Sequence, residues 1–219
     1  MKLVWTAFLG GLLIGCGSAD GTLRPPSPSP SPEASPAKKK ELPWLNVMGG
    51  RMKTTLFYGP WQCNQKFMGM CQKECASDSH LLMGCMWLAD IKLDWEGHLL
   101  VPPLPVKAGS RYPIFHCCCD YRPLAPAEKK PLRDRWESQR ESFRNKWSSK
   151  FGEWPAEDGV AWPGHHILDL WHGGDPVDPN NIIPVEPSVH IDFGRKYPAC
   201  YEGKAPWNAA GADLPYTDE

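Results

Sequence analysis

The chain has 219 residues, enough for one full domain or two small ones, and its formal net charge of -1 excludes a uniformly basic or acidic protein. Charge is distributed unevenly: residues 126–151 carry eight Lys or Arg against four Asp or Glu, whereas residues 152–219 carry three against twelve. A basic segment therefore precedes an acidic C-terminal part.

Residues 1–15 are typical of a secretory leader. Lys2 is followed by an apolar run that is too short to span a bilayer as a mature helix, and small residues precede a cysteine. The ending LIGC, whose cysteine is Cys16, resembles a bacterial lipobox, and Gly17 follows as in lipoproteins sorted to the outer membrane. The resemblance implies cleavage before Cys16 and lipidation of Cys16. The alternative is an ordinary leader with a chance cysteine.

Residues 16–43 are expected to form the lipid anchor and a linker. Residues 18–40 consist largely of Pro, Ser and small polar residues, with almost no side chains that could pack. Such a segment is extended and partly polyproline II, at about 3 Å per residue. It would hold the body of the protein away from the membrane.

Residues 44–125 are expected to form a cysteine-rich domain. Eight cysteines remain when Cys16 is set aside, and an even number in an exported protein favours disulfides. The pairing stays open, but Cys117, Cys118 and Cys119 are expected to find different distant partners, because neighbouring residues rarely have the geometry to bridge.

The same region allows other interpretations. A zinc site built from Cys71 and Cys75, with His80 or His116 as a further ligand, is the alternative to disulfides. Otherwise these histidines are expected to be structural. Residues 90–106 are typical of a strand, a Glu-Gly turn and a second strand.

Residues 126–219 are expected to hold a long helix and a second domain. The helix is predicted over residues 127–152, because Pro131 suits a first turn and Gly152 suits the position after the last turn. Apolar side chains recur at steps of four or seven and form one stripe: Leu132, Trp136, Phe143, Trp147 and Phe151. The basic side chains lie mostly off this stripe. They form either a solvated face or a surface that follows phosphates beside a site.

The last part of the chain concentrates chemistry-bearing residues. Residues 164–190 contain four of the seven histidines and predict the order strand, loop, strand, helix. Phosphodiester hydrolysis needs a base that activates water and a cation that neutralises phosphate charge. Because adjacent strand residues face opposite sides, or diverge where the strand ends, His165 and His166 can serve these two roles separately.

This pattern resembles the HNH, or His-Me finger, nucleases, and most of all their colicin-type and GHH-type branch. The matching positions are His165-His166, Gly173-Gly174, Asn181 and the VHID stretch around His190. The resemblance implies an α+β fold with a small ββα-metal core at the C-terminus. It implies that His166 is the general base, that Asn181 holds the ββ loop and the base, and that His165 and His190 bind a divalent metal ion.

One position departs from this family. Its helix carries a further histidine ligand four residues after the first, and here that position is Gly194. The metal identity therefore stays open among Mg²⁺, Zn²⁺ and Ni²⁺, and Asp169, His172 or Asp192 could add a ligand. An inactive relative is the alternative. 

The residues after the predicted helix histidine contribute two further expectations. Arg195 and Lys196 are expected to contact a substrate phosphate. Tyr197 and Tyr201 are expected to pack the core.

The layout of the whole chain resembles polymorphic toxins, and more narrowly the SitA-type lipoprotein toxins of myxobacteria. The resemblance implies an outer-membrane lipoprotein facing the periplasm, passed to recipient cells by outer-membrane exchange machinery. There its C-terminal domain would cut nucleic acid, DNA or RNA, unless a cognate immunity protein is present. The alternative is a non-enzymatic, disulfide-rich envelope lipoprotein that serves as a binding or structural module.

Overall fold

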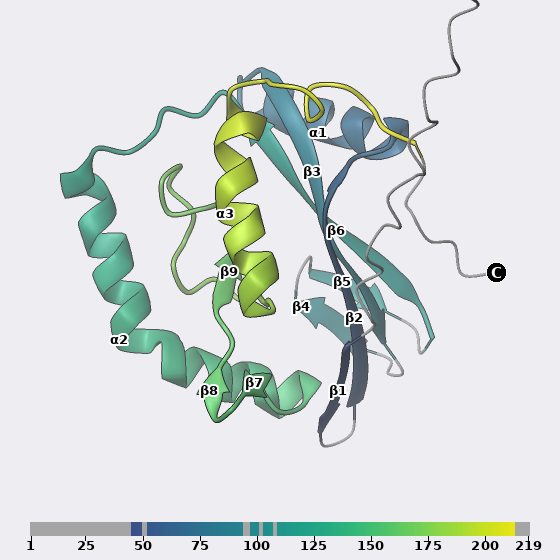
Figure 1. Cartoon of the computed structure of the whole chain (residues 1–219), viewed down its shortest axis with the longest axis vertical. Helices are drawn as coiled ribbons and strands as arrows, with labels where there is room; N and C mark the ends of the chain where they lie inside the picture. The colour runs from purple at the N-terminus through teal and green to yellow at the C-terminus, as the bar shows by residue number, and fades with distance from the viewer. Residues whose placement is uncertain (1–44, 50–51, 94–96, 101–102, 107–108, 213–219) are drawn as a thin grey trace, which may run out of the picture. The chain divides into compact units, whose positions relative to one another are not determined.

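The computed structural model describes residues 45–49, 52–93, 97–100, 103–106 and 109–212 (Figure 1). The predicted leader, the lipidation site Cys16 and the whole predicted linker lie outside these residues. The described residues belong to one compact unit, Glu41–Glu219. Among them, no helix is both long enough and apolar enough to cross a membrane.

The fold is a mixture of helices and small antiparallel sheets, as predicted at that level. The largest sheet has the strand order β1-β2-β3-β6, and its strands are β1 (Leu45–Gly49), β2 (Met52–Gln62), β3 (Leu82–Leu93) and β6 (Arg111–Cys119). The other strands form pairs, namely β4 (Gly97–Leu100) with β5 (Pro103–Val106), β7 (Ala156–Glu157) with β8 (Val160–Ala161), and β9 (Gly164–His166) with β10 (Ile182–Pro184). The helices are α1 (Gln65–Ser77), α2 (Pro126–Phe151) and α3 (Pro187–Tyr201).

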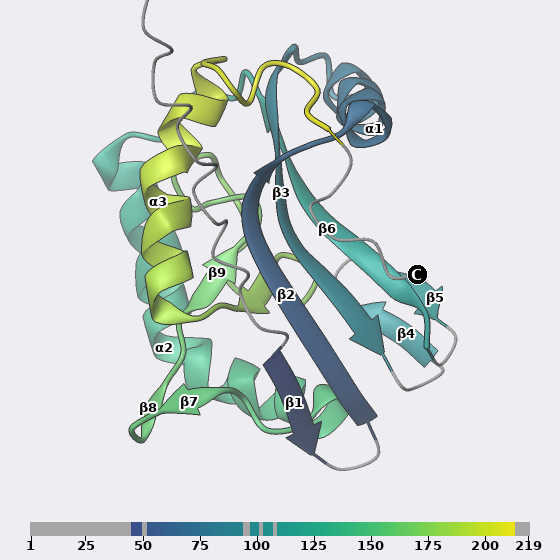
Figure 2. The same cartoon turned by 45° about the vertical axis from the view of Figure 1, so that its right-hand side comes forward.

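The large sheet has a different side-chain layer on each face. Successive strand residues point to opposite faces, so Cys117 and Cys119 of β6 face α1 whereas Cys118 faces α3. The first layer contains Phe57, Phe67 and Trp87 with most of the cysteines, and the second joins the sheet to α2 and α3. Figure 2 shows α1 on one side of the sheet and α3 along the other.

The three consecutive cysteines pair with distant partners, as predicted. Cys71 and Cys75 lie one turn apart on α1 and bind Cys117 and Cys119. The remaining bonds are Cys63–Cys85 and Cys118–Cys200. These bonds overturn the zinc alternative, because a sulfur in a disulfide is not a thiolate ligand.

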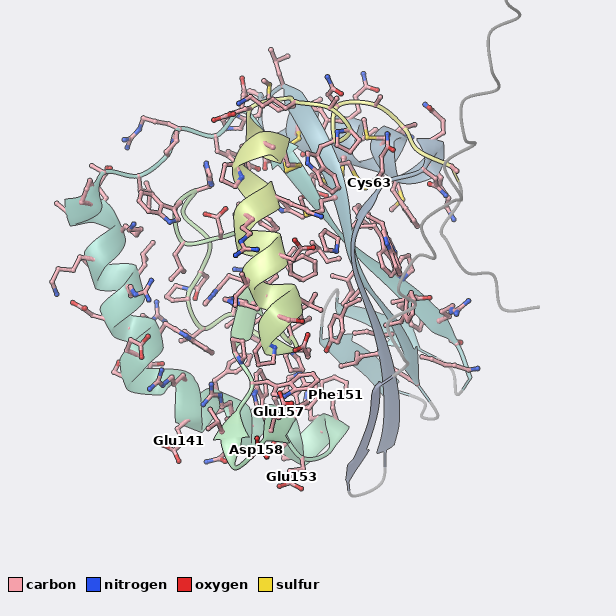
Figure 3. All side chains as sticks on the ribbon, in the orientation of Figure 1. Cys63, Glu141, Phe151, Glu153, Glu157 and Asp158 are labelled. Atoms are coloured by element: carbon pink, nitrogen blue, oxygen red, sulfur yellow. A yellow bond between two sulfur atoms is a disulfide. The ribbon has the colours of Figure 1, made fainter. Side chains whose placement is uncertain are left out.

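The long helix begins and ends within one residue of its predicted bounds. Four of the five predicted stripe residues, Trp136, Phe143, Trp147 and Phe151, are buried. Figure 3 shows Phe151 at the lower end of α2, close to the exposed Glu153, Glu157 and Asp158.

The segment expected to hold a strand, a turn and a strand has strands on both sides of the expected turn, but its second part forms two strands, β4 and β5. Residues 90–93 are the end of β3 and pair with β2 and β6, whereas β4 pairs with β5. The sheet therefore depends on pairings between strands that are distant in the sequence.

The predicted boundary at residue 125 crosses a shared core. Side chains of β2, β3 and β6 pack in one cluster with side chains of α2 and α3, and Cys118–Cys200 joins β6 to α3. A separate module at residues 126–219 stays a prediction, while the structure places both segments in one compact unit.

Candidate functional site

The predicted order strand, loop, strand, helix is present as β9, a loop, β10 and α3. The two strands are antiparallel, with His166 opposite Ile182 and His165 opposite Ile183. Glu186 caps α3, since its carboxylate accepts hydrogen bonds from the first amides of the helix, and Pro187 occupies the first turn. His190 follows on the first turn of α3, so the helix begins beside the strand pair.

Asn181 closes the loop between the two strands. Its side-chain oxygen accepts from the Leu168 amide at 2.7 Å, and its side-chain nitrogen donates to the carbonyls of Leu168 at 2.9 Å and Asp175 at 3.1 Å. Asn181 is buried, so these bonds satisfy polar groups that would otherwise lack water.

The Gly173-Gly174 pair makes this closure possible. Gly173 has φ +88°, a conformation that favours glycine. A Cβ on Gly174 would lie 1.8 Å from the Leu168 carbonyl oxygen and 2.9 Å from the Asn181 side-chain nitrogen. Only a residue without a side chain allows the loop to pack this closely.

His166 has its proton position set by a backbone carbonyl. Its Nε2 lies 3.1 Å from the Pro176 carbonyl oxygen, which can only accept, so Nε2 carries the hydrogen and Nδ1 keeps the lone pair. The ring is buried against Trp136 of α2, with ring centroids 5.0 Å apart. Burial lowers the pKa of His166, and the Pro176 hydrogen bond opposes this only in part. The imidazole is therefore neutral at neutral pH, which is the form a base requires.

His165 is held by Tyr197 in a similar way. The Tyr197 hydroxyl lies 3.0 Å from the Ile167 carbonyl oxygen and donates to it, so it accepts from His165 Nε2 at 2.8 Å. This arrangement leaves the lone pair of His165 on Nδ1. Burial, followed by the charges of His190 and His166, holds the pKa of His165 well below its ordinary value.

His165 and His190 are close enough to share a divalent ion. Their ring centroids are 5.5 Å apart, with ring planes at 80°. An imidazole nitrogen binds such an ion at about 2.1 Å, which this spacing accommodates. Within the described ranges, no group of three or more His, Cys, Asp or Glu side chains is arranged to hold a metal. His165 and His190 are therefore the two side chains that would hold a divalent ion here.

Gly194 lies on the same side of α3 as His190 and lines the same pocket. A Cβ built there would meet nothing within 4 Å. In the family that the sequence resembles, this position carries a metal ligand; here it borders open space.

The three carboxylate or imidazole groups considered as extra ligands already have partners. His172 Nδ1 lies 3.0 Å from the Asp169 carboxylate, and Asp192 pairs with Lys196 at 3.2 Å. Burial opposes ionisation of Asp169, but the hydrogen bond to His172 and the electrostatic interactions with His172 and His116 hold its pKa below the usual value. Asp169 and His172 nevertheless line the pocket, whereas Asp192 does not.

The pocket has a volume of about 480 Å³ and lies between α2, the loop after β9 and α3 (Figure 1). His165, His166 and His190 line it together. Among the other lining side chains are the basic Lys129 and Arg133 of α2, the exposed Trp171, and Tyr197 and Tyr201.

The predicted phosphate contacts lie elsewhere on the helix. Arg195 is exposed and Lys196 is paired with Asp192, and neither lines the pocket. Their role as substrate contacts stays a prediction.

The sequence analysis did not predict that Tyr197 holds a histidine of the candidate site. Helical spacing could have indicated it, because residues 190, 194, 197 and 201 share one face of a helix. One of the two interpretations of the basic side chains of α2 was a surface that follows phosphates beside a site. Lys129 and Arg133 line the pocket, as that interpretation requires. The contribution of Trp171 has no comparable signal, since it lies in an irregular loop.

No family model, curated protein or solved structure matches this chain.

Proposed function

We propose that this protein is a metal-dependent endonuclease whose general base is His166. The observation that carries the proposal is the neutral His166 ring, with Nε2 bound to a carbonyl and Nδ1 left as acceptor, in one pocket with His165 and His190. A base with a fixed proton position beside two potential metal ligands is what phosphodiester hydrolysis needs.

Each residue has a separate role in the reaction. His166 Nδ1 accepts a proton from water, and the water oxygen attacks phosphorus. The bond between phosphorus and the leaving oxygen then breaks, and the leaving oxygen takes a proton from solvent. Tyr197 orients His165 and the Asn181 bonds hold the loop that carries the Pro176 carbonyl. A divalent ion on His165 and His190 supplies charge neutralisation at the phosphate and the leaving oxygen.

Lys129 and Arg133 support a polyanionic substrate. Both line the pocket from α2. The exposed acidic residues Glu153, Glu157 and Asp158 lie near the other end of α2 (Figure 3). Asp169 and Glu202 line the pocket, but they are bonded to His172 and Lys204.

The wider biological role rests on the N-terminal pattern and the resemblance. In this proposal, the chain is a lipoprotein toxin anchored through Cys16, delivered to recipient cells and neutralised there by an immunity protein. The four disulfides support an extracytoplasmic location before delivery, because such bonds persist in oxidising compartments.

The test uses residues 17–219, which retain the whole compact unit, with the disulfides oxidised. Plasmid DNA and total tRNA are incubated with the protein and with Mg²⁺, Ni²⁺, Zn²⁺ or EDTA. We expect metal-dependent cleavage that His166→Ala lowers by at least about 100-fold, the usual size of general-base catalysis.

The matched control is His80→Ala. His80 is half-buried, bonds Asp120 and lies outside the pocket, so its removal should leave cleavage unchanged. If folded protein cleaves neither substrate with any of the metals, the nuclease proposal fails and a non-enzymatic envelope role is favoured.

A further inference from the structure

Trp171 exposes a large aromatic surface at the pocket. Five large apolar side chains are exposed among the described residues, and only Trp171, at 52 %, lines the pocket. An indole that opens onto a pocket offers a flat aromatic face on which a planar ligand group can stack.

The Trp171 backbone is fixed on both sides. Its amide donates to the Asp169 carboxylate at 2.7 Å, and its carbonyl accepts from the Leu124 amide at 2.7 Å. The Lys129 ammonium lies over the indole, 2.7 Å from the ring centroid, which is a cation–π contact. The indole is therefore presented beside the histidines with a positive charge next to it.

Two cations on the pocket side of α2 are not neutralised. Lys129 and Arg133 lie one helical turn apart, and in the part of the chain that the structure describes neither forms an ion pair. Neighbours on the same helix do, namely Lys130 with Asp134 and Arg140 with Glu137. The carboxylates that line the pocket, Asp169 and Glu202, bond His172 and Lys204 instead. Lys129 and Arg133 thus keep positive charge on the α2 side of the pocket, where a phosphate would neutralise it.

We propose that Trp171, Lys129 and Arg133 bind one unpaired nucleotide, so that the substrate class is single-stranded nucleic acid or an unpaired segment. The base stacks on the face of the indole opposite the Lys129 ammonium, and the phosphates lie against the two cations. In a duplex both faces of each base are covered by its neighbours, so only an unpaired base can reach Trp171. This inference rests on the proposed nuclease site and adds its substrate class; DNA and RNA offer the same chemistry.

The test measures binding without cleavage. Residues 17–219 with His166→Ala are titrated in EDTA into short fluorescein-labelled oligonucleotides, single-stranded or duplex, of DNA or RNA, and anisotropy is followed. We expect the single strands to bind at least about tenfold more tightly than the duplexes. Trp171→Ala should weaken single-strand binding by about 10- to 100-fold, and Trp171→Phe should weaken it much less, since phenylalanine still stacks.

The cations have their own readout. The slope of the logarithm of the binding constant against the logarithm of the salt concentration measures the number of phosphate contacts. The double change Lys129→Gln and Arg133→Gln should reduce the size of this slope by about 1.4, because each of the two contacts contributes about 0.7. Arg135→Gln, on the same helix but outside the pocket, should leave the slope unchanged.

Two results would overturn the inference. One is duplex binding as tight as single-strand binding, and the other is single-strand affinity that Trp171→Ala leaves unaltered. Because cleavage is not measured, a nuclease that fails this test remains a nuclease. A protein that binds single strands through Trp171 but never cuts would retain the binding of an unpaired nucleotide and would overturn the proposed function.

Discussion

The two adjacent histidines of β9 differ in the partner that holds each ring. His165 donates to the Tyr197 hydroxyl and His166 donates to the Pro176 carbonyl, so both keep their lone pair on Nδ1. The sequence could predict that neighbouring strand residues have separate roles. It could not predict the proton positions, because Tyr197 and Pro176 reach the rings through the folding of the loop and of α3.

The Tyr197 hydroxyl should matter for both stability and metal binding. In Tyr197→Phe, His165 Nε2 and the Ile167 carbonyl lose their partner inside the protein, which costs about 1–3 kcal/mol of unfolding free energy. Loss of a group that orients a ligand typically lowers metal affinity by about 10- to 100-fold. Denaturant unfolding and calorimetric titration with Ni²⁺ measure the two effects. Tyr112→Phe, outside the pocket, is the control, and equal metal affinity in both variants would contradict the assigned role of Tyr197.

The open space at Gly194 allows a missing ligand to be added. Gly194→His should raise the affinity for Zn²⁺ or Ni²⁺ by at least about tenfold, since a third imidazole completes the ligand set typical of catalytic zinc. Gly194→Ala is the matched control, because it brings the same helix stabilisation of about 0.5–1 kcal/mol without a ligand. Calorimetry that finds the two variants equal in metal affinity would show that a side chain at position 194 does not reach a metal ion held by His165 and His190.

At the scale of elements, local patterns predicted more than long-range pairings. The apolar stripe of α2 and the order of β9, β10 and α3 follow from spacing within short segments. The four-stranded sheet does not, because its register depends on which distant strands share an apolar face. The run Cys117–Cys119 carried the clearest long-range signal, since alternating strand residues must find partners on opposite faces.

Substituting the two glycines of the loop between β9 and β10 should change the unfolding free energy by different amounts. Gly173→Ala imposes φ +88° on an L-residue and should cost about 1–2 kcal/mol of unfolding free energy. Gly174→Ala should cost more than this and should also lower cleavage, because its Cβ displaces the Leu168 carbonyl that Asn181 binds. Denaturant unfolding and the nuclease assay on both variants check the order, and a larger loss in Gly173→Ala would contradict the packing argument.

At the scale of the whole molecule, buried neutral histidines couple stability to pH. His116 lies between the sheet and α3, with its ring stacked on Tyr197 and edge-on to Tyr201. Burial lowers the pKa of His116 to about 4, while Asp169 raises it and His172 lowers it to a smaller extent. Below pH 6.5 the unfolded chain therefore takes up a proton on His116, whereas the folded protein does so only as the pH approaches about 4.

The resulting loss of stability falls in a defined pH window. His116 contributes fully above pH 6.5, and its contribution is lost as the pH falls toward about 4, with about 2 kcal/mol lost between pH 7 and pH 5. Denaturant unfolding at these two pH values should show a smaller decrease in His116→Gln than in the wild type. Burial also lowers the pKa values of His165, His166 and His190, and these histidines are present in both proteins. The difference between the wild type and His116→Gln therefore reports the contribution of His116. Identical decreases would mean that His116 takes up its proton in the folded state.

The disulfides also act on the whole molecule, but one of them bears on the site. Cys118–Cys200 spans 82 residues and holds the last turn of α3, the helix that carries His190 and Tyr197. Cys63–Cys85 spans 22 residues and lies on the α1 face. In the chain-entropy description, the longer loop contributes about 4 kcal/mol and the shorter about 3 kcal/mol.

Removing each bond by paired alanine substitutions should separate stability from activity. The two variants should lose similar unfolding free energy, yet cleavage measured where both are folded should fall much more without Cys118–Cys200. The reason is that α3 then loses its covalent link to β6, and the His190 ring can move relative to His165, 5.5 Å away between centroids. Equal residual cleavage in the two variants would show that core packing alone positions α3. A selective loss would mean that reduction of this bond lowers the activity of the proposed nuclease site.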